Sequence, residues 1–147
     1  MKDNCFDICI IGSGVIGLSI AYSLSKSFNN IIVVDKEYTF GQHISSRNSE
    51  VIHSGFYYPI NSLKSLLCVK GNKLLYAFAD KYKINFKRCG KLIVANSIRE
   101  KNELIRIQKQ ASQNGVLCEL LLDEAVKNKE PKIKNKIALW VPSAGII

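Results

Sequence analysis

Residues 6–17 read Phe-Asp-Ile-Cys-Ile-Ile-Gly-Ser-Gly-Val-Ile-Gly, and this stretch decides how the chain begins to fold. The residues before the glycines are mostly apolar and β-branched, which predicts a short buried strand. Residues 15–27 place apolar side chains at helical spacing, so the glycines lie where a strand turns into a helix. Gly12 permits a tight turn, Gly14 lets a phosphate approach the backbone, and Gly17 lets the helix pack closely on the strand. The free amides at the helix N-terminus are then placed to hold a diphosphate.

A second apolar run, residues 31–34, is followed directly by Asp35. A carboxylate at the end of the second strand is placed to accept hydrogen bonds from a ribose hydroxyl. Strand, glycine turn, helix, strand and terminal acid in this order predict a dinucleotide-binding site. The alternative is a tight strand-to-helix turn that binds nothing. Lys36 follows the acid and is expected near the adenosine, without indicating a 2′-phosphate.

Composition places the chain among globular proteins, with 147 residues, 47% hydrophobic and 22% charged. The formal net charge is +9, and part of it lies in a loose lysine cluster between residues 127 and 136. No recognition helix or RNA-binding motif accompanies the lysines, so solvated faces are expected and nucleic-acid binding is not. Weak attraction to anionic lipid or to an acidic partner is the lesser alternative.

Cysteine usage and hydropathy indicate the compartment. The five cysteines include no C-x-x-C pair, which predicts free thiols in a reducing environment and no metal site. No apolar run is long enough to span a bilayer, and Met1-Lys2-Asp3-Asn4 lacks the layout of a secretion signal. A soluble cytoplasmic protein is expected, with peripheral contact at the inner face of the membrane left open.

The rest of the chain is predicted to alternate loops, helices and short strands. Ser45 or Ser46 is expected to cap a short helix over residues 47–51, and residues 52–59 are expected to be extended. A long helix from Ser62 to Tyr82 is predicted, and Gly71 inside it suggests the close approach of another backbone. Its expected buried face consists of six apolar residues: Leu63, Leu66, Leu67, Leu74, Leu75 and Phe78. The remaining predicted elements are strands at 85–89 and 91–95, a polar helix at 98–114, a strand at 116–121, a short helix from Asp123 and a strand at 137–141.

The predicted fold class is α/β. After Asp35 the chain does not return quickly to a third parallel strand, as a nicotinamide-binding domain normally does. We therefore expect a Rossmann-like nucleotide-binding domain, residues 1–82, that is interrupted by the start of an α+β substrate-side domain, residues 83–147.

The run from Ser45 to Pro59, Ser-Ser-Arg-Asn-Ser-Glu-Val-Ile-His-Ser-Gly-Phe-Tyr-Tyr-Pro, carries a family resemblance. Together with the glycine motif it resembles the FAD-dependent oxidoreductases of the D-amino-acid-oxidase-like superfamily, and within it the L-2-hydroxyglutarate oxidase/dehydrogenase group. Further matches lie at residues 62–64, 67–69, 71, 89–95, 114–116, 130–131 and 141–146, so the resemblance covers essentially the whole chain. It implies FAD as the cofactor and oxidation of a 2-hydroxy acid to a 2-oxo acid.

Members of that family are much longer than this chain, which stops at Ile147. We therefore expect an N-terminal portion in which the flavin site is incomplete. A shortened, non-catalytic gene product and one half of a split enzyme with a second chain are both left open. Within the superfamily, an FAD-dependent glycerol-3-phosphate dehydrogenase is the second candidate, because it has a comparable Ser/Arg-rich run. The electron acceptor is not indicated by the sequence.

His53 matches a histidine of the resembling family and is the predicted catalytic base or flavin contact, since an imidazole titrates near neutral pH. The alternative is a structural histidine that orients the turn before Gly55. Arg47 could bind a carboxylate or the FAD diphosphate, because a guanidinium forms paired hydrogen bonds with both, and contact with the cofactor is favoured. Four neighbours share that predicted cofactor contact or lie close to it: Ser45, Ser46, Asn48 and His43. Three further residues are assigned otherwise: Tyr57 and Tyr58 to core or substrate, and Glu50 to the short helix.

Overall fold

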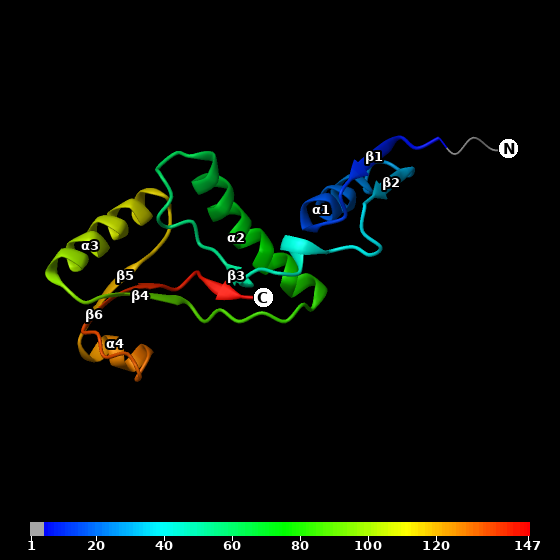
Figure 1. Cartoon of the computed structure of the whole chain (residues 1–147). Coiled ribbons are helices and arrows are strands. Elements are labelled where there is room, and N and C mark those ends of the chain that lie inside the picture. The colour runs from blue at the N-terminus through cyan, green and yellow to red at the C-terminus, as the bar shows by residue number, and fades with distance from the viewer. Residues whose placement is uncertain (1–4) are drawn as a thin grey trace. The chain divides into compact units, whose positions relative to one another are not determined.

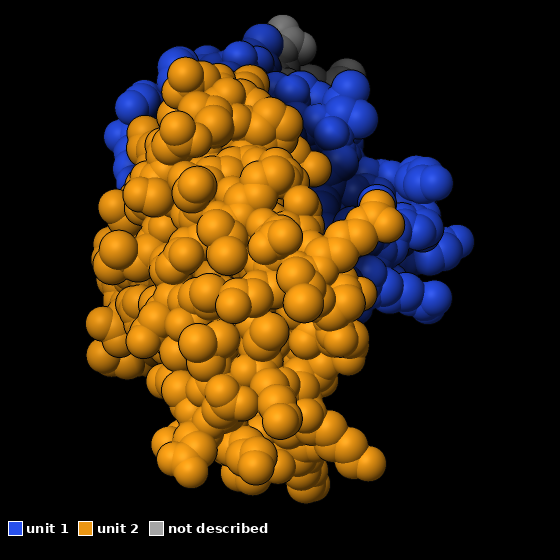
Figure 2. All heavy atoms as spheres, turned by 90° about the vertical axis from the view of Figure 1, so that its left-hand side faces the viewer, with its two compact units in different colours: residues 1–49 blue, residues 50–147 orange. Residues whose placement is uncertain are grey.

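A computed structural model describes residues 5–147, and its chain divides into two compact units, Met1–Ser49 and Glu50–Ile147 (Figure 2). The first four residues, whose sequence argued against a secretion signal, lie outside the described range. The functional division expected between residues 82 and 83 stays a prediction, because the compact units are defined by backbone contacts and not by what each part binds.

The first unit has the strand–helix–strand order that the glycine motif predicts (Figure 1). Strand β1 (Ile8–Ile11) pairs in parallel with β2 (Ile31–Val34), and helix α1 (Val15–Leu24) connects them. A short 3-10 helix, η1 (His43–Ser45), follows in the loop after β2. Among the described residues of this unit, Ile10 alone is buried. The unit therefore has local order with almost no core of its own.

The second unit contains two sheets and three helices. Its elements are β3 (Val51–Ile52), α2 (Leu63–Tyr82), β4 (Lys91–Ala95), α3 (Ile98–Gln113), β5 (Glu119–Leu122), α4 (Glu124–Lys129), β6 (Ile137–Val141) and β7 (Gly145–Ile146). Strand β6 lies between β4 and β5 and is antiparallel to both. Strands β3 and β7 form a second, antiparallel pair.

The core of the second unit forms on both faces of the three-stranded sheet, because successive side chains of a strand point to opposite faces. Leu139 of β6 packs with Leu104 of α3, whereas its neighbour Ala138 packs with Val126 of α4. All four side chains are buried. Figure 1 shows α3 and α4 on the two sides of this sheet. Successive apolar side chains of β6 therefore pack against different helices, one on each face of the sheet.

The helix predicted over residues 47–51 is wrong. The helical turn is η1, four residues earlier, and the strand β3 begins at Val51. Glu50 has a φ of 53°, a left-handed conformation that a right-handed helix does not contain, so it lies on no helix face. The prediction for Gly71 is also wrong, since a Cβ placed there meets nothing within 4 Å.

The long helix is confirmed with Ser62 as its N-cap, but its buried face is not the predicted one. The buried residues of α2 are Ser65, Asn72, Tyr76 and Ala79. All six leucine and phenylalanine side chains of the expected face are exposed. The physical reason is the partner surface, which presents backbone carbonyls: Asn72 donates to the oxygens of His53 and Ser143, and Tyr76 to that of Ser143.

The later elements mostly match. Helix α3 ends at Gln113 with Gly115 in the left-handed region, as predicted. Residues 85–89 contribute one isolated bridge, between Lys87 and Ile146, and no longer strand is found there in the described chain. Within residues 5–147, none of the helices has the length and apolar character needed to cross a bilayer.

Candidate nucleotide-binding turn and the His53 turn

Two glycines of the motif have the roles that their spacing predicted. Gly12 has a φ of 105°, which glycine adopts at no steric cost, and its N–H donates to Val34 O at 2.7 Å. A Cβ on Gly17 would overlap the carbonyl oxygen of Gly12 and lie 3.4 Å from the side chain of Ile10. Helix α1 therefore packs against the turn more closely than any larger residue allows.

Gly14 is the N-cap of α1 and lies beside Ser45. The Ser45 hydroxyl accepts from Val15 N–H at 2.9 Å, so it satisfies one of the amides at the start of the helix. A Cβ on Gly14 would meet that hydroxyl at 3.0 Å. The predicted capping role of Ser45 is thus found on α1, thirty residues away in sequence, and not on a helix of its own.

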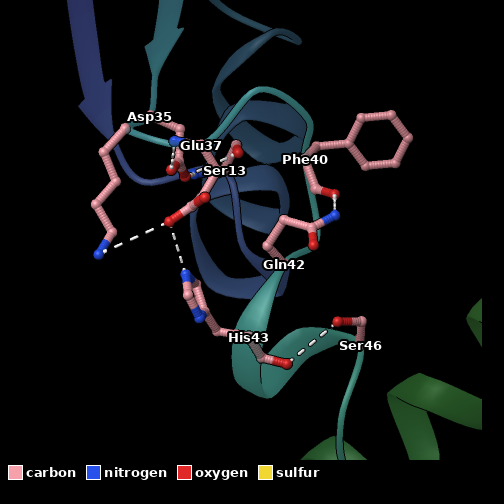
Figure 3. A network of polar contacts seen from close by, with 8 residues as sticks. Ser13, Asp35, Glu37, Phe40, Gln42, His43 and Ser46 are labelled. Atoms are coloured by element: carbon pink, nitrogen blue, oxygen red, sulfur yellow. Dashed lines mark hydrogen bonds and ion pairs between the residues drawn. The ribbon is translucent and has the colours of Figure 1, made fainter.

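Asp35 binds the glycine turn. One carboxylate oxygen accepts from Ser13 N–H at 2.5 Å and from Ser13 Oγ at 2.8 Å, and the other accepts from Glu37 N–H at 3.0 Å (Figure 3). These hydrogen bonds, first of all the Ser13 amide, lower the pKa of Asp35 from 3.8 to about 2. A carboxylate offers about four lone pairs, so acceptor capacity remains for a ribose hydroxyl.

The loop after β2 is tied together by further polar contacts, which Figure 3 shows. Glu37 Oε1 lies 2.8 Å from His43 Nε2 and 3.7 Å from Lys36 Nζ. Ser46 Oγ donates to His43 O at 3.2 Å, and Asn48 donates to Ser45 O at 3.2 Å. Arg47 is exposed, and its guanidinium has no hydrogen-bond or ion-pair partner among residues 5–147. The six predicted loop residues therefore lie in one segment, and Ser45 is the one whose hydrogen bond to the start of α1 is described above.

The turn fits an anionic ligand. The first turn of α1 contains no acidic residue, and its N-cap is a glycine without a side chain to fill the site. The partial positive charge of a helix N-terminus favours a phosphate group there. The chain residues that would hold such a group are Gly12, Gly14, Gly17 and Ser45, with Asp35 on the ribose side.

His53 lies in the second unit, directly after β3. Its Nδ1 accepts from Gly55 N–H at 2.9 Å and lies 3.4 Å from Cys68 Sγ, while its Nε2 is buried without a partner among the described residues. Burial, followed by the charges of Lys91 and Lys64, lowers the pKa of His53. The hydrogen bond from Gly55 is the contact expected if His53 is a structural residue that orients this turn. The role of His53 as a base stays a prediction.

The turn after His53 is aromatic and is held by amide side chains from the C-terminal end of α3. The imidazole stacks on Phe56 and Tyr58 and lies edge-on to Tyr57. Gln110 donates to Tyr57 O and Tyr58 O at 2.8 and 2.7 Å. One turn further, Asn114, the C-cap of α3, donates to Tyr58 O and Gly55 O. The backbone carbonyls of this turn are therefore fixed by two side chains more than fifty residues away.

Sequence reasoning missed the residues that hold these turns. They are Ser13 and Glu37 in the first unit and Cys68, Asn72, Gln110 and Asn114 in the second. The spacing of Gln110 and Asn114 places both on one helix face, which was a usable signal. The partners of Asn72 and Cys68 have no such signal, because a loop carbonyl can pair with any polar side chain that faces it.

Comparison with known proteins identifies the family to which both units belong. The sequence pattern of the FAD-dependent oxidoreductase (DAO) family matches residues 7–147. The chain belongs to this family. Its glycine turn, β2 acid and His53 segment are therefore parts of a DAO-family fold, and the resemblance inferred from the sequence is confirmed.

Curated relatives are similar over nearly the whole chain. The L-2-hydroxyglutarate dehydrogenases of Arabidopsis thaliana and Homo sapiens are 41% and 40% identical, over 96% and 98% of this chain. That of Escherichia coli is 36% identical over 97%. The chain covers only 29%, 32% and 34% of these three proteins. It thus spans about a third of the length of the curated relatives it matches.

Solved structures confirm the fold. The L-α-glycerophosphate oxidase of Mycoplasma pneumoniae has a TM-score of 0.82 and 25% identity, over 96% of this chain and 38% of that one. Glycine oxidase of Geobacillus kaustophilus also reaches 0.82, with 22% identity, over 96% of this chain and 40% of its own. The second likeness concerns the fold alone. The predicted α/β, Rossmann-like flavoprotein fold is therefore correct.

Proposed function

We propose that this chain is the nucleotide-binding part of an FAD-dependent oxidoreductase that oxidises L-2-hydroxyglutarate, or a related 2-hydroxy acid, to the 2-oxo acid. The observation that carries the proposal is the identity of about 40% to curated L-2-hydroxyglutarate dehydrogenases over nearly all of the chain. The flavin, when bound, supplies the two-electron acceptor of the reaction. We also propose a cytoplasmic location, following the sequence prediction.

The chain's own contribution is binding and orientation. In the proposed site Gly12 and Gly14 leave room for the diphosphate, and the N-terminus of α1 attracts it. Asp35 accepts a ribose hydroxyl through its remaining acceptor capacity. Arg47, which is exposed and unpaired within the described chain, is available for a phosphate or a carboxylate. The proposed cofactor-binding set is completed by Gly17, Lys36, Ser45, Ser46 and Asn48.

A second candidate is oxidation of glycerol 3-phosphate. It is supported by the structural likeness to the glycerophosphate oxidase of Mycoplasma pneumoniae, which was solved with FAD bound. Both substrates are small anionic alcohols, so the nucleotide-binding turn does not distinguish them. The higher identity to the hydroxyglutarate dehydrogenases favours the first candidate.

A chimaera tests the proposal. This chain replaces the matched 144 residues of the Escherichia coli relative, which supplies the two-thirds that the chain does not cover. We expect a yellow protein whose flavin is bleached by L-2-hydroxyglutarate without oxygen. Because the Escherichia coli enzyme supplies about two-thirds of the chimaera, the bleaching tests whether this chain completes a working flavin site and not which substrate its own full-length protein oxidises. A colourless chimaera, beside a yellow parent enzyme, contradicts the FAD-binding role.

Gly14→Ala in this chimaera tests the turn itself. The new methyl group would crowd the diphosphate, so flavin content should fall by tenfold or more, the equivalent of about 1.4 kcal/mol of binding. It would also meet Ser45 Oγ at 3.0 Å. The double variant Gly14→Ala/Ser45→Gly removes that second contact and is compared with Ser45→Gly alone, because Ser45 itself belongs to the proposed site and caps Val15 N–H. Rescue of flavin binding by the double variant would assign the loss to Ser45 and not to the ligand.

A further inference from the structure

The two nitrogens of His53 have different surroundings. Nδ1 accepts a hydrogen bond from the backbone N–H of Gly55 at 2.9 Å. A backbone amide can only donate, so Nδ1 must carry a lone pair. In a neutral imidazole the ring proton then resides on Nε2. His53 is thus held as the Nε2–H tautomer.

The neighbours of Nδ1 enforce this state. Cys68 Sγ lies 3.4 Å from Nδ1 and 3.6 Å from His53 O, and both of these atoms are acceptors. Burial raises the pKa of the Cys68 thiol, which keeps its proton available for donation. Asn72 donates to His53 O at 3.2 Å and fixes the backbone at the same point. The Gly55 amide is therefore the fixed donor to Nδ1, and the single proton of the Cys68 thiol can be donated to His53 O or to Nδ1.

The turn that supplies the amide has little freedom to move. Gly55 has a φ of 83°, and a Cβ there would lie 2.9 Å from Val69 of α2. Its carbonyl accepts from Asn114 at the end of α3. The Gly55 amide is consequently held at Nδ1 by packing on one helix and by a hydrogen bond to another.

The surroundings of His53 disfavour a second proton on the imidazole. It would have to enter at Nδ1 and break the bond from Gly55. The ionisable groups around the ring are Lys64 and Cys68 from α2, Lys91 from β4, and Tyr57 and Tyr58 from the turn itself. Neither lysine stabilises a cation, and no carboxylate faces the ring among the described residues. The imidazole is therefore kept neutral.

The Nε2–H group is left buried and without an acceptor in the described part of the chain. Buried donors in folded proteins are nearly always paired, and exceptions concentrate at functional positions. We propose that His53 serves the flavoenzyme as an Nε2–H hydrogen-bond donor to a carbonyl or carboxylate oxygen of the bound flavin or of the 2-hydroxy acid, and not as the base that takes the hydroxyl proton. This role rests on the proposed function. The tautomer does not.

Nitrogen-15 NMR of the 147-residue chain, labelled at histidine, tests the tautomer directly. The chain has two histidines, so His43→Gln assigns the remaining signals to His53. We expect an unprotonated Nδ1 and a protonated Nε2 at neutral pH, and a pKa of His53 below the ordinary histidine value of 6.5. A proton on Nδ1, or a doubly protonated ring at neutral pH, overturns the proposal whether or not the protein binds flavin.

The donor role is tested in the chimaera with two substitutions. His53→Gln keeps an N–H donor but does not titrate, whereas His53→Ala removes the donor. For a donor, flavin reduction falls about tenfold in His53→Ala, equivalent to one hydrogen bond, and less than about threefold in His53→Gln, with an unchanged pH profile. Equal losses in both variants, with loss of the acidic limb of the profile, would identify a base and overturn the proposal.

The acceptor is located by two readouts on His53→Ala. If the acceptor belongs to the flavin, the absorbance of the oxidised, substrate-free protein shifts. If it belongs to the substrate, the absorbance is unchanged and KM rises. Either result supports a donor at Nε2. A variant with unchanged absorbance, KM and reduction rate contradicts it, and a chimaera without flavin contradicts the proposed function instead.

Discussion

The two compact units of this chain differ in what stabilises them. In the first, residues 5–49, the strands and helix follow from local signals, and only Ile10 is buried. In the second, a three-stranded sheet carries α3 on one face and α4 on the other, with buried residues throughout. The contrast shows that the glycine turn of the candidate nucleotide site is specified by glycine geometry and hydrogen bonds with hardly any core. Its predicted consequence is unequal stability of the two units.

Truncation of a core side chain should give the largest difference in stability loss between the two units. Leu139 is fully buried between α3 and the sheet, so Leu139→Ala should destabilise the second unit by about 2–5 kcal/mol. Ile10 is 9% exposed and has little core around it, so Ile10→Ala should cost its unit less. Residue-level amide exchange measures both, because it reports each unit by itself. Equal losses for the two variants would remove the contrast.

A pair of helical glycines sharpens the comparison at the level of the turn. A Cβ on Gly17 overlaps Gly12 O, so Gly17→Ala should destabilise the β1–α1 packing by about 1–3 kcal/mol, as overpacking does. Gly71 in α2 has open space, so Gly71→Ala is the matched control and should stabilise its helix by about 0.5–1 kcal/mol. Amide exchange in α1 and α2 gives the two signs. A stabilising Gly17→Ala would contradict the close packing.

These glycines also show what could be predicted from sequence. The β1–α1–β2 order and the roles of Gly12 and Gly17 depend on chain-local geometry, and the motif encodes that geometry. The predictions of a helix at 47–51 and of an apolar buried face on α2 were wrong because both features depend on partners distant in sequence. Ser45 caps α1 through Val15, and α2 meets the carbonyls of His53 and Ser143 instead of an apolar surface. Periodicity predicted that α2 exists, but not what it packs against.

The polar face of α2 provides the next test. Asn72 is 8% exposed and donates to two carbonyls, so Asn72→Ala removes the shorter hydrogen bond from each and should cost about 1–3 kcal/mol. The longer bonds, from Cys68 Sγ to His53 O and from Tyr76 OH to Ser143 O, remain. Tyr76→Phe removes one longer bond to Ser143 O, 3.3 Å, and keeps the ring, so about 0.5–1.5 kcal/mol is expected. Urea unfolding of the second unit, followed through its single tryptophan, compares them. The reverse order would indicate that the Tyr76 hydroxyl, and not the Asn72 amide, is the main donor to Ser143 O.

The smallest expected effect concerns the Asp35 contact with the glycine turn, which is exposed and open to solvent. Its pKa is lowered to about 2 by the Ser13 and Glu37 amides and the Ser13 hydroxyl, so the ionised form is bound more tightly than the protonated one. The stabilisation is therefore complete above the ordinary carboxyl pKa of 3.8, and is lost as the pH falls through about 2. The protection of the Ser13 amide against hydrogen exchange, corrected for intrinsic exchange, should weaken over that pH range, whereas the protection of the Leu139 amide should not follow the same titration.

Asp35→Asn should abolish this pH dependence, because an asparagine side chain does not ionise. It should also loosen the turn at neutral pH, because one of the two polar atoms of the asparagine side chain is a donor that would face an amide N–H. If Ser13 protection were the same in Asp35→Asn as in the parent chain at neutral pH, the carboxylate would not be what holds the turn, and its capacity would be free for the ribose alone.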